Sequence, residues 1–480
     1  MTKINKRANS LVKVAKLKEF NCLQITWLLA PIFIWFSYYP VIILGKNSTM
    51  NLELSLTLIY LLALGLVSAI SIGRKVKQNS CKKLLQNKLI LSVVVFNLLC
   101  QLSLVWTTNL LRGVLTSGVI FIVSLVIVGA ILNRAEIKRA TPAMIKLLFL
   151  SAALMSIIAI LEVVLGSTKA GLLCVGCTAD KFGFVRPNVF TIEPQFFANI
   201  LILPSILAVY KFLTIKCKGR AVIYGGLIFL FSFAIYLSLS RGAIYAFWVG
   251  SFLAILFLIM KIKNRWKSLS VVLILAVSLI VSISFAALSS KYNPNVTSSF
   301  WGTVSRSLNH LSLDVIKKFD RQSKNEQSIS QQLNDKKIQP VYSGYVAEST
   351  NVRVDLSQKA LLAWQGGGYL KMFFGAGIGS SGVAMASLNG GDSKQIVQNQ
   401  YIAILLELGF IGLSIFLYII IATFRLTVKE KWLWGIIVSY LMQWLFFNGL
   451  PNAIHIYLMI AILLALFSTS TSQNLPKSTK

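Results

Sequence analysis

The stretch that decides the fold is a 40-residue apolar run at residues 221–260, with the sequence AVIYGGLIFLFSFAIYLSLSRGAIYAFWVGSFLAILFLIM. As one helix this run would be about 60 Å long at 1.5 Å per residue, twice the roughly 30 Å thickness of the hydrocarbon core of a bilayer. The run must therefore fold back on itself. Ser240-Arg241-Gly242 is the polar, turn-forming point near its middle. We therefore predict a helical hairpin with Arg241 at its tip, at one face of a membrane.

The rest of the chain has the same character. Of its 480 residues, 56% are hydrophobic and only 13% are charged, whereas soluble domains average about 25% charged residues. Backbone groups in lipid must be satisfied within their own segment, so apolar runs of about 20 residues are predicted to be helices. Such runs lie near 22–44, 52–72, 88–108, 113–132, 143–165, 188–213, 221–240, 243–260, 269–288, 397–424, 433–449 and 453–467. The sequence thus predicts an all-α, polytopic integral membrane protein with about twelve transmembrane helices.

Basic residues in the loops predict the orientation. The alternate loops that include the N-terminus hold 29 Lys and Arg, whereas the short loops of the other set hold six. Because cytoplasmic loops carry the excess of Lys and Arg, both termini are expected in the cytoplasm. One large late loop is then extracytoplasmic, and apolar spacing near its second half predicts a helix on the membrane surface. The expected organisation is helices one to nine in 1–288, the large loop in 289–400 with a surface helix near 352–364, helices ten to twelve in 401–467, and a cytoplasmic tail in 468–480.

Charge and cysteines restrict the partners. The net charge of +32 is spread over many short loops at one face, which indicates membrane lipids as partners rather than nucleic acid. Cys174 and Cys177 form one CxxC motif in an outer loop. A single CxxC is a weak zinc signal, so the pair is interpreted as either a disulfide or two free thiols. No metal and no cofactor are predicted.

Three arginines on the predicted outer face are the first candidates for function. Arg186 opens the segment RPNVFTIEP before the sixth helix, Arg241 is at the hairpin tip, and Arg353 starts the surface helix. Arginine at a membrane face often marks a binding site, and its planar fork suits phosphate oxygens. The alternative for each is an interface arginine whose charged end reaches into water.

Several motifs of the chain resemble those of the O-antigen polymerase and ligase superfamily (Wzy-type polymerases and WaaL-type ligases). The matching pieces are LSLSRGA at 237–243, RPNVFTIEP at 186–194, Arg353 with Trp364, GAGIG at 375–379, and QNQY at 398–401 running into ELGFIG at 407–412. The resemblance covers roughly residues 180–425.

The resemblance implies glycosyl transfer from a polyprenyl-diphosphate-linked oligosaccharide at the outer face of the bacterial cytoplasmic membrane, without metal or cofactor. By position, Arg186 and Arg241 would hold the leaving diphosphate, with Arg353 assisting. The further substrate-binding positions implied are Gln398, Asn399, Gly377 and Gly379. A chain-length regulator is a further partner that the resemblance suggests.

One departure bears on the reaction. Ligase members carry a histidine, thought to act as a base, at the position that Gln398 occupies here. An amide cannot accept a proton near pH 7, so we expect a polymerase, with a ligase as the alternative. Glu193 is the first candidate for a base, or else a carboxylate favoured by the N-terminus of the following helix. A transporter or lipid-linked sugar flippase is the further alternative.

Overall fold

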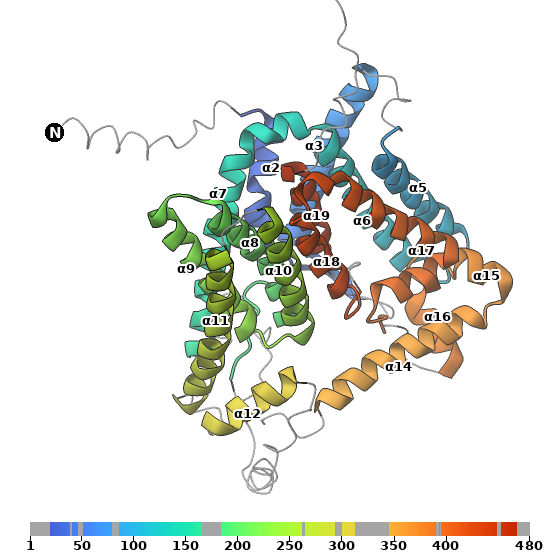
Figure 1. Cartoon of the computed structure of the whole chain (residues 1–480). Coiled ribbons are helices and arrows are strands. Elements are labelled where there is room, and N and C mark those ends of the chain that lie inside the picture. The colour runs from blue at the N-terminus through green and yellow to red at the C-terminus, as the bar shows by residue number, and fades with distance from the viewer. Residues whose placement is uncertain are drawn as a thin grey trace, which may run out of the picture.

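The computed structural model describes residues 20–38, 41–46, 51–78, 86–165, 184–261, 265–292, 300–312, 345–389, 393, 395–448 and 453–467. Within them, nine helices are long and apolar enough to cross a membrane, and three further apolar helices are shorter. Figure 1 shows these helices as one bundle. The predicted all-α, polytopic membrane fold is therefore confirmed. Cys174, Cys177 and the tail at 468–480 lie outside the described residues.

The elements follow one another along the chain in this order: α2 Cys22–Phe33, β1 Val41–Lys46, β2 Asn51–Ser55, α3 Leu56–Gln78, α5 Lys88–Leu102, η2 Ser103–Val105, α6 Leu110–Leu132, α7 Arg134–Leu165, α8 Pro194–Thr214, α9 Lys218–Leu237, α10 Arg241–Lys261, α11 Arg265–Tyr292, α12 Phe300–Leu311, α14 Tyr345–Gln365, α15 Gly368–Phe374, α16 Ser381–Asn389, α17 Gln400–Leu426, η4 Val428–Glu430, α18 Leu433–Gln443 and α19 Ile454–Phe467.

The first apolar run differs from its prediction. It was expected to be helical over 22–44, but α2 ends at Phe33, and the chain continues into an antiparallel pair of short strands, β1 and β2. Pro31 lies in the last turn of α2, which it weakens because proline has no N–H to donate within the helix. The prediction of a spanning helix here was wrong because hydropathy alone does not separate a helix from an apolar strand.

The centre of the bundle is α8, the most deeply buried of the nine long helices. The predicted hairpin consists of α9 and α10, and both of these helices pack against α8. Helices α10 and α18 approach so closely that a Cβ at Gly435 would lie 2.2 Å from the carbonyl oxygen of Gly250. Ser439 on α18 donates its hydroxyl to the carbonyl of Ala246 on α10 at 2.8 Å. Small residues thus let these two helices pack backbone to backbone.

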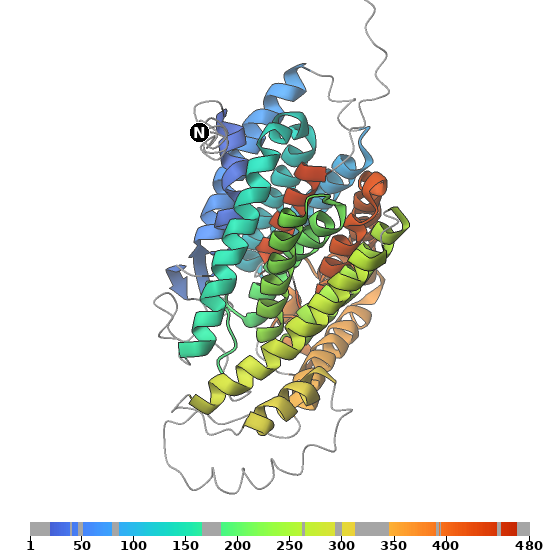
Figure 2. The same ribbon diagram turned by 60° about the vertical axis from the view of Figure 1, so that its left-hand side comes forward.

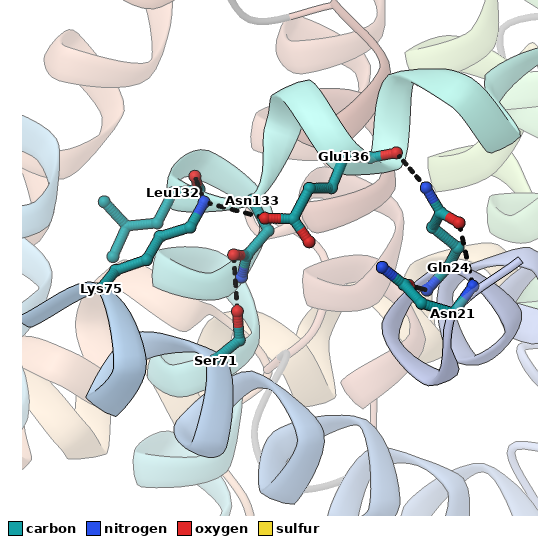
Figure 3. A network of polar contacts seen from close by, with 7 residues as sticks. All are labelled: Asn21, Gln24, Ser71, Lys75, Leu132, Asn133 and Glu136. Carbon is teal, nitrogen blue, oxygen red and sulfur yellow. Dashed lines mark hydrogen bonds and ion pairs between the residues drawn. The ribbon is translucent and has the colours of Figure 1, made fainter. Parts of the chain in front are cut away.

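One end of the bundle is fastened by polar contacts at the α6–α7 joint, as Figure 3 shows. Lys75 on α3 donates to the carbonyl of Leu132 at 2.5 Å and pairs with Glu136 at 3.4 Å. Gln24 on α2 donates to the backbone carbonyl of Glu136 at 2.9 Å. The network joins α2 and α3 to α7 at the face predicted to be cytoplasmic.

The opposite end carries the late helices. Figures 1 and 2 both place α12 and α14 at the end of the bundle away from the α6–α7 joint. Residues 184–193, which precede α8, and the turn between α9 and α10 lie at this end as well, because they bond to each other and to α12. This end therefore gathers residues that are far apart in the sequence.

Candidate active site

The turn between α9 and α10 is the organising point of the site. Leu239 has a φ of +44°, a conformation rare for a branched residue, and it turns two backbone carbonyls toward neighbouring side chains. The carbonyl of Ser238 accepts a hydrogen bond from Nε of Arg186 at 2.6 Å. The carbonyl of Leu239 lies 3.1 Å from Nε2 of His310 on α12. Arg241 follows directly and begins α10.

The segment that carries Arg186 is held by a buried carboxylate. Glu162, near the end of α7, is only 3% exposed, and its Oε2 accepts the backbone N–H groups of Asn188 and Val189 at 3.2 and 3.1 Å. Val189 has a φ of +51°, which is strained for a β-branched residue. The two hydrogen bonds therefore offset a local strain and fix the chain two residues after Arg186.

A pair of glutamines holds the other side of the site. Gln443 at the end of α18 donates Nε2 to the carbonyl of Gly242 at 2.9 Å. Its Oε1 accepts the side-chain amide of Gln195, in the first turn of α8, at 3.3 Å. Because all of these groups are buried, they fix the first turn of α10 relative to α8.

Helix α12 presents His310 to this turn. Thr303, Ser307 and His310 share one face of the helix and are buried, whereas Trp301 and Leu308 lie on another face and are exposed. Such segregation is typical of a helix that lies at an interface. The hydrogen bond to the Leu239 carbonyl then fixes the orientation of the His310 ring.

The three candidate arginines converge on His310. Burial lowers the pKa of His310 well below its usual range, and the positive charges of Arg241, Arg186 and Arg353 lower it further. The hydrogen bond to the Leu239 carbonyl opposes this shift. His310 is therefore neutral at physiological pH, and the positive charges of three arginines act on it.

Arg353 reaches the site from α14, which covers the segment where a surface helix was expected. Leu356 and Ala360 pack against α16, α17 and the segment between them, and their spacing from Arg353 places the arginine on nearly the same face. Asp355 and Lys359 form an i,i+4 ion pair at 2.7 Å on this helix. The packing of α14 thus places Arg353 near the face that meets α16 and α17.

The expected substrate-binding glycines lie in a second cluster. In the loop from Gly375 to Gly379, φ is +93° at Gly377 and +78° at Gly379. A Cβ at Gly377 would lie 2.5 Å from Cα of Thr107, just before α6, and a Cβ at Gly379 would lie 2.5 Å from the backbone nitrogen of Gly113, at the start of α6. Its backbone also bonds to α17: the N–H of Gly377 donates to the carbonyl of Glu407 at 2.9 Å. At both glycines the backbone thus approaches another part of the protein closely.

Asn399 caps α17, accepting the N–H groups of Tyr401 and Ile402 at 2.9 and 3.1 Å. Gln398 precedes it and is half-buried. Glu193 is the N-cap residue of α8, but its side chain makes no cap hydrogen bond and is exposed.

Sequence reasoning missed two residues of the site. His310 was outside every matched motif, and its only signal was that the chain has two histidines. Glu162 lies in an apolar run, and an acidic residue in such a run is a recognised sign of function or of a buried partner.

A cavity lies between α5, α6, α17, α18 and α19. Its lining is almost wholly apolar, and it contains about 870 Å³ of empty space, part of it open to the surroundings. A smaller, more polar space of about 400 Å³ adjoins it and is lined by Arg112, Gln400 and Glu407. Trp444, at the end of α18, lines the large cavity. The preceding residue, Gln443, bonds to the first turn of α10, which begins with Arg241.

Comparison with known proteins gives one match. Residues 226–417 match the O-antigen ligase family, a range that contains Arg241, His310 and Arg353, and that begins after Arg186. No curated protein matches the chain. The match indicates a glycosyltransferase-like membrane enzyme that acts on a lipid-linked glycan. Over residues 226–417 the chain is thus similar to the O-antigen ligase family, which supports a place in the superfamily of O-antigen polymerases and ligases.

Proposed function

We propose that the protein is a polysaccharide polymerase that joins polyprenyl-diphosphate-linked oligosaccharide units at the outer face of the bacterial cytoplasmic membrane. The observation that carries the proposal is the convergence of Arg186, Arg241 and Arg353 around one buried, neutral histidine. The orientation with both termini in the cytoplasm rests on the distribution of Lys and Arg.

The arginines are suited to the leaving group. As the bond between the anomeric carbon and the diphosphate breaks, negative charge grows on the diphosphate oxygens. Cationic donors already fixed around that position stabilise the transition state more than the ground state. Arg186 is held by its hydrogen bond to the Ser238 carbonyl, and the backbone of Arg241 is fixed at the start of α10. The two arginines therefore need little reorganisation during the reaction. Removing one such donor typically costs about 2.7–4 kcal/mol of barrier.

The products distinguish polymerase from ligase. A polymerase needs no acceptor other than a second lipid-linked unit, whereas a ligase transfers the glycan to a different acceptor. Gln398 in place of the ligase histidine favours the polymerase. Loss of a polymerase leaves single units on the final acceptor, and loss of a ligase leaves finished polymer on the lipid carrier.

The test is polymerisation by the purified protein in lipid nanodiscs, supplied only with polyprenyl-diphosphate-linked units and followed by the length of the glycan. We expect long glycans from the unaltered protein and from a control, Arg139→Ala, whose exposed arginine lies on α7 at the opposite end of the bundle. Arg186→Ala and Arg241→Ala should each lower turnover about 100-fold or more. Long glycans from the double variant would refute this assignment. Polymer formed only when a separate lipid acceptor is added would identify a ligase.

A further inference from the structure

The two spaces between α5, α6, α17, α18 and α19 form one continuous cavity. Phe96, Ile120 and Ile404 line both the large apolar space of about 870 Å³, here called the chamber, and the polar space of about 400 Å³, here called the pocket. The pocket is lined by Arg112, in the first turn of α6. The chamber extends toward the other end of that helix, where it is lined by Ile127. The cavity thus matches a lipid whose headgroup lies near the face predicted to be extracytoplasmic.

The length of the cavity indicates the kind of lipid. Along α6, the rise from position 112 to position 127 is about 22 Å at 1.5 Å per residue, whereas half of the hydrocarbon core of a bilayer is only about 15 Å thick. Thr423, in the last turn of α17, lines the chamber as well. A chain that starts at Arg112 and fills the chamber therefore passes the midplane of the membrane. Phospholipid tails of one leaflet end near the midplane, but a polyprenyl chain is long enough to continue.

Arg112 supplies the pocket with a buried positive charge. It is 6% exposed, and its backbone N–H donates to the side chain of Asn109 at 3.3 Å, which fixes it in the first turn of α6. The guanidinium group stays charged when buried, and its charge acts on the carboxyl group of Glu407 on α17. Glu407 also accepts the N–H of Ser381 at 3.3 Å, which holds it against the start of α16. An arginine inside a membrane bundle often marks a binding site, and its planar fork suits phosphate oxygens.

Irregular backbone forms the wall beside Arg112. Helix α17 is interrupted at Gly409, which has a φ of +67°, and Ile378 of the glycine loop lines the pocket. The N–H of Ile378 donates to the hydroxyl of Ser103 at 3.2 Å, and its carbonyl accepts the hydroxyl of Thr107 at 2.8 Å. Within a membrane, non-helical backbone is tolerated where it is buried in protein or lines a cavity, and interrupted helices often carry binding sites. The pocket is therefore a built site rather than a gap in the packing.

We propose that this cavity binds the acceptor unit, with its diphosphate at Arg112 and its polyprenyl chain in the chamber. The inference rests on the proposed function, because a polymerase must hold two lipid-linked units at once. The anomeric carbon at the lipid end of the acceptor is occupied by its own diphosphate, so the attacking hydroxyl belongs to a sugar further along. The diphosphate of the acceptor must then lie away from the breaking bond. The described residues that line the chamber and the pocket include none of Arg186, Arg241 and Arg353.

The end of α18 borders both sites. Gln443 donates to the carbonyl of Gly242 in the first turn of α10, and Trp444 lines the chamber. The N–H of Gln400, a residue that lines the pocket, donates to the carbonyl of Trp444 at 2.8 Å. A glycan anchored in the pocket therefore needs to extend only past this element to reach the donor. Because one arginine lines the pocket and three surround the donor site, the pocket is the weaker site for the bare diphosphate.

The test separates the two substrates by their chemistry. A donor whose terminal sugar is capped cannot act as an acceptor, and an acceptor with a phosphonate carbon in place of the anomeric oxygen cannot act as a donor, so each has its own KM. Arg112→Gln should raise the KM of the acceptor about tenfold or more, with the KM of the donor within about threefold of its usual value. Arg112→Lys keeps the charge but not the fork, so its KM for the acceptor should lie between the two.

The chamber is tested at two neighbouring residues of α17. Ile420 lines the chamber, so Ile420→Trp should occupy part of it and raise the KM of the acceptor about tenfold. Ile421 is 47% exposed, so Ile421→Trp is the matched control and should leave both KM values unchanged. A third arm needs no substitution. In the unaltered protein, an acceptor carried on farnesyl diphosphate, whose chain is too short to fill the chamber, should have a KM about tenfold higher than the polyprenyl-linked one.

The proposal is overturned if folded Arg112→Gln and Ile420→Trp both leave the KM of the acceptor unchanged, or if Arg112→Gln raises the KM of donor and acceptor equally. It is also overturned if the farnesyl-linked and polyprenyl-linked acceptors are used equally well, as they would be if a membrane phospholipid filled the chamber. Failure of the proposed function would instead appear as full turnover in the double variant Arg186→Ala and Arg241→Ala, whatever the KM of the acceptor.

Discussion

Removal of the Glu162 carboxylate should release the Arg186 segment. Both N–H groups that Glu162 accepts, those of Asn188 and Val189, are buried. Each buried N–H group left without an acceptor costs about 1–3 kcal/mol, so Glu162→Ala should lower the free energy of unfolding by about 2–6 kcal/mol. The strained φ of Val189 adds to the tendency of the segment to move once it is released.

Glu162→Gln is the matched comparison. Both N–H groups donate to the same oxygen, Oε2, so an amide oxygen at that position can still accept both. Neutral hydrogen bonds contribute about 0.5–1.5 kcal/mol each, and the glutamine variant should therefore lose only about half as much stability as the alanine variant. Ser156→Ala on the same helix is the control, because the Ser156 hydroxyl bonds only within α7, to the carbonyl of Ala152 at 2.8 Å. It should cost less than about 1.5 kcal/mol.

The assay is unfolding in mixed detergent micelles, paired with the affinity for polyprenyl diphosphate. We expect Glu162→Ala to weaken binding about tenfold or more, with Glu162→Gln between it and the unaltered protein. If the alanine and glutamine variants unfold and bind as the unaltered protein does, Glu162 does not position Arg186, and the reasoning is refuted.

Three further predictions concern backbone approach, protonation and helix placement. Gly377→Ala should destabilise the protein by several kcal/mol, because Gly377 has a positive φ and the new Cβ would lie 2.5 Å from Cα of Thr107. The control is Gly73→Ala, whose new Cβ would meet nothing within 4 Å. It should stabilise α3 by about 0.5–1 kcal/mol in the same unfolding assay. Because the pKa of His310 is lowered in the folded protein, its contribution to stability is present at pH 8 and is lost as the pH falls below about 6.5. The free energy of unfolding should therefore fall less between pH 8 and pH 5 in His310→Gln than in the unaltered protein. Gln443→Leu should lower turnover, since it removes the bond that fixes the first turn of α10; unchanged turnover and stability would show that this tie is dispensable.

The sequence was sufficient for the elements whose signal is local. The 40-residue run at 221–260 is too long for one span, and its single polar point at Ser240 to Gly242 predicted the turn that the structure contains. The region at 22–44 has a similar hydropathy, yet it divides into α2 and a strand. Pairing of β1 with β2 is a contact between separate segments, and hydropathy does not report it.

The site was predictable only in part for the same reason. Chemistry and position made Arg186, Arg241 and Arg353 candidates, and they do lie together around His310. His310 itself could not be found from sequence, because its place depends on how α12 returns to the α9–α10 turn. Gly377 and Gly379 were expected to bind substrate, which stays a prediction, and sequence could not show that a Cβ at either position would meet the protein backbone.

The most direct test of the central claim is the affinity of the purified protein for polyprenyl diphosphate in nanodiscs, measured with both Arg186 and Arg241 replaced by alanine and compared with Arg139→Ala. If the guanidinium groups bind the diphosphate together, each contributes about 1.5–3 kcal/mol, and the double variant should bind about 100-fold more weakly or worse while Arg139→Ala binds normally. Equal affinity in the double variant and the control, with both proteins folded, would contradict the account.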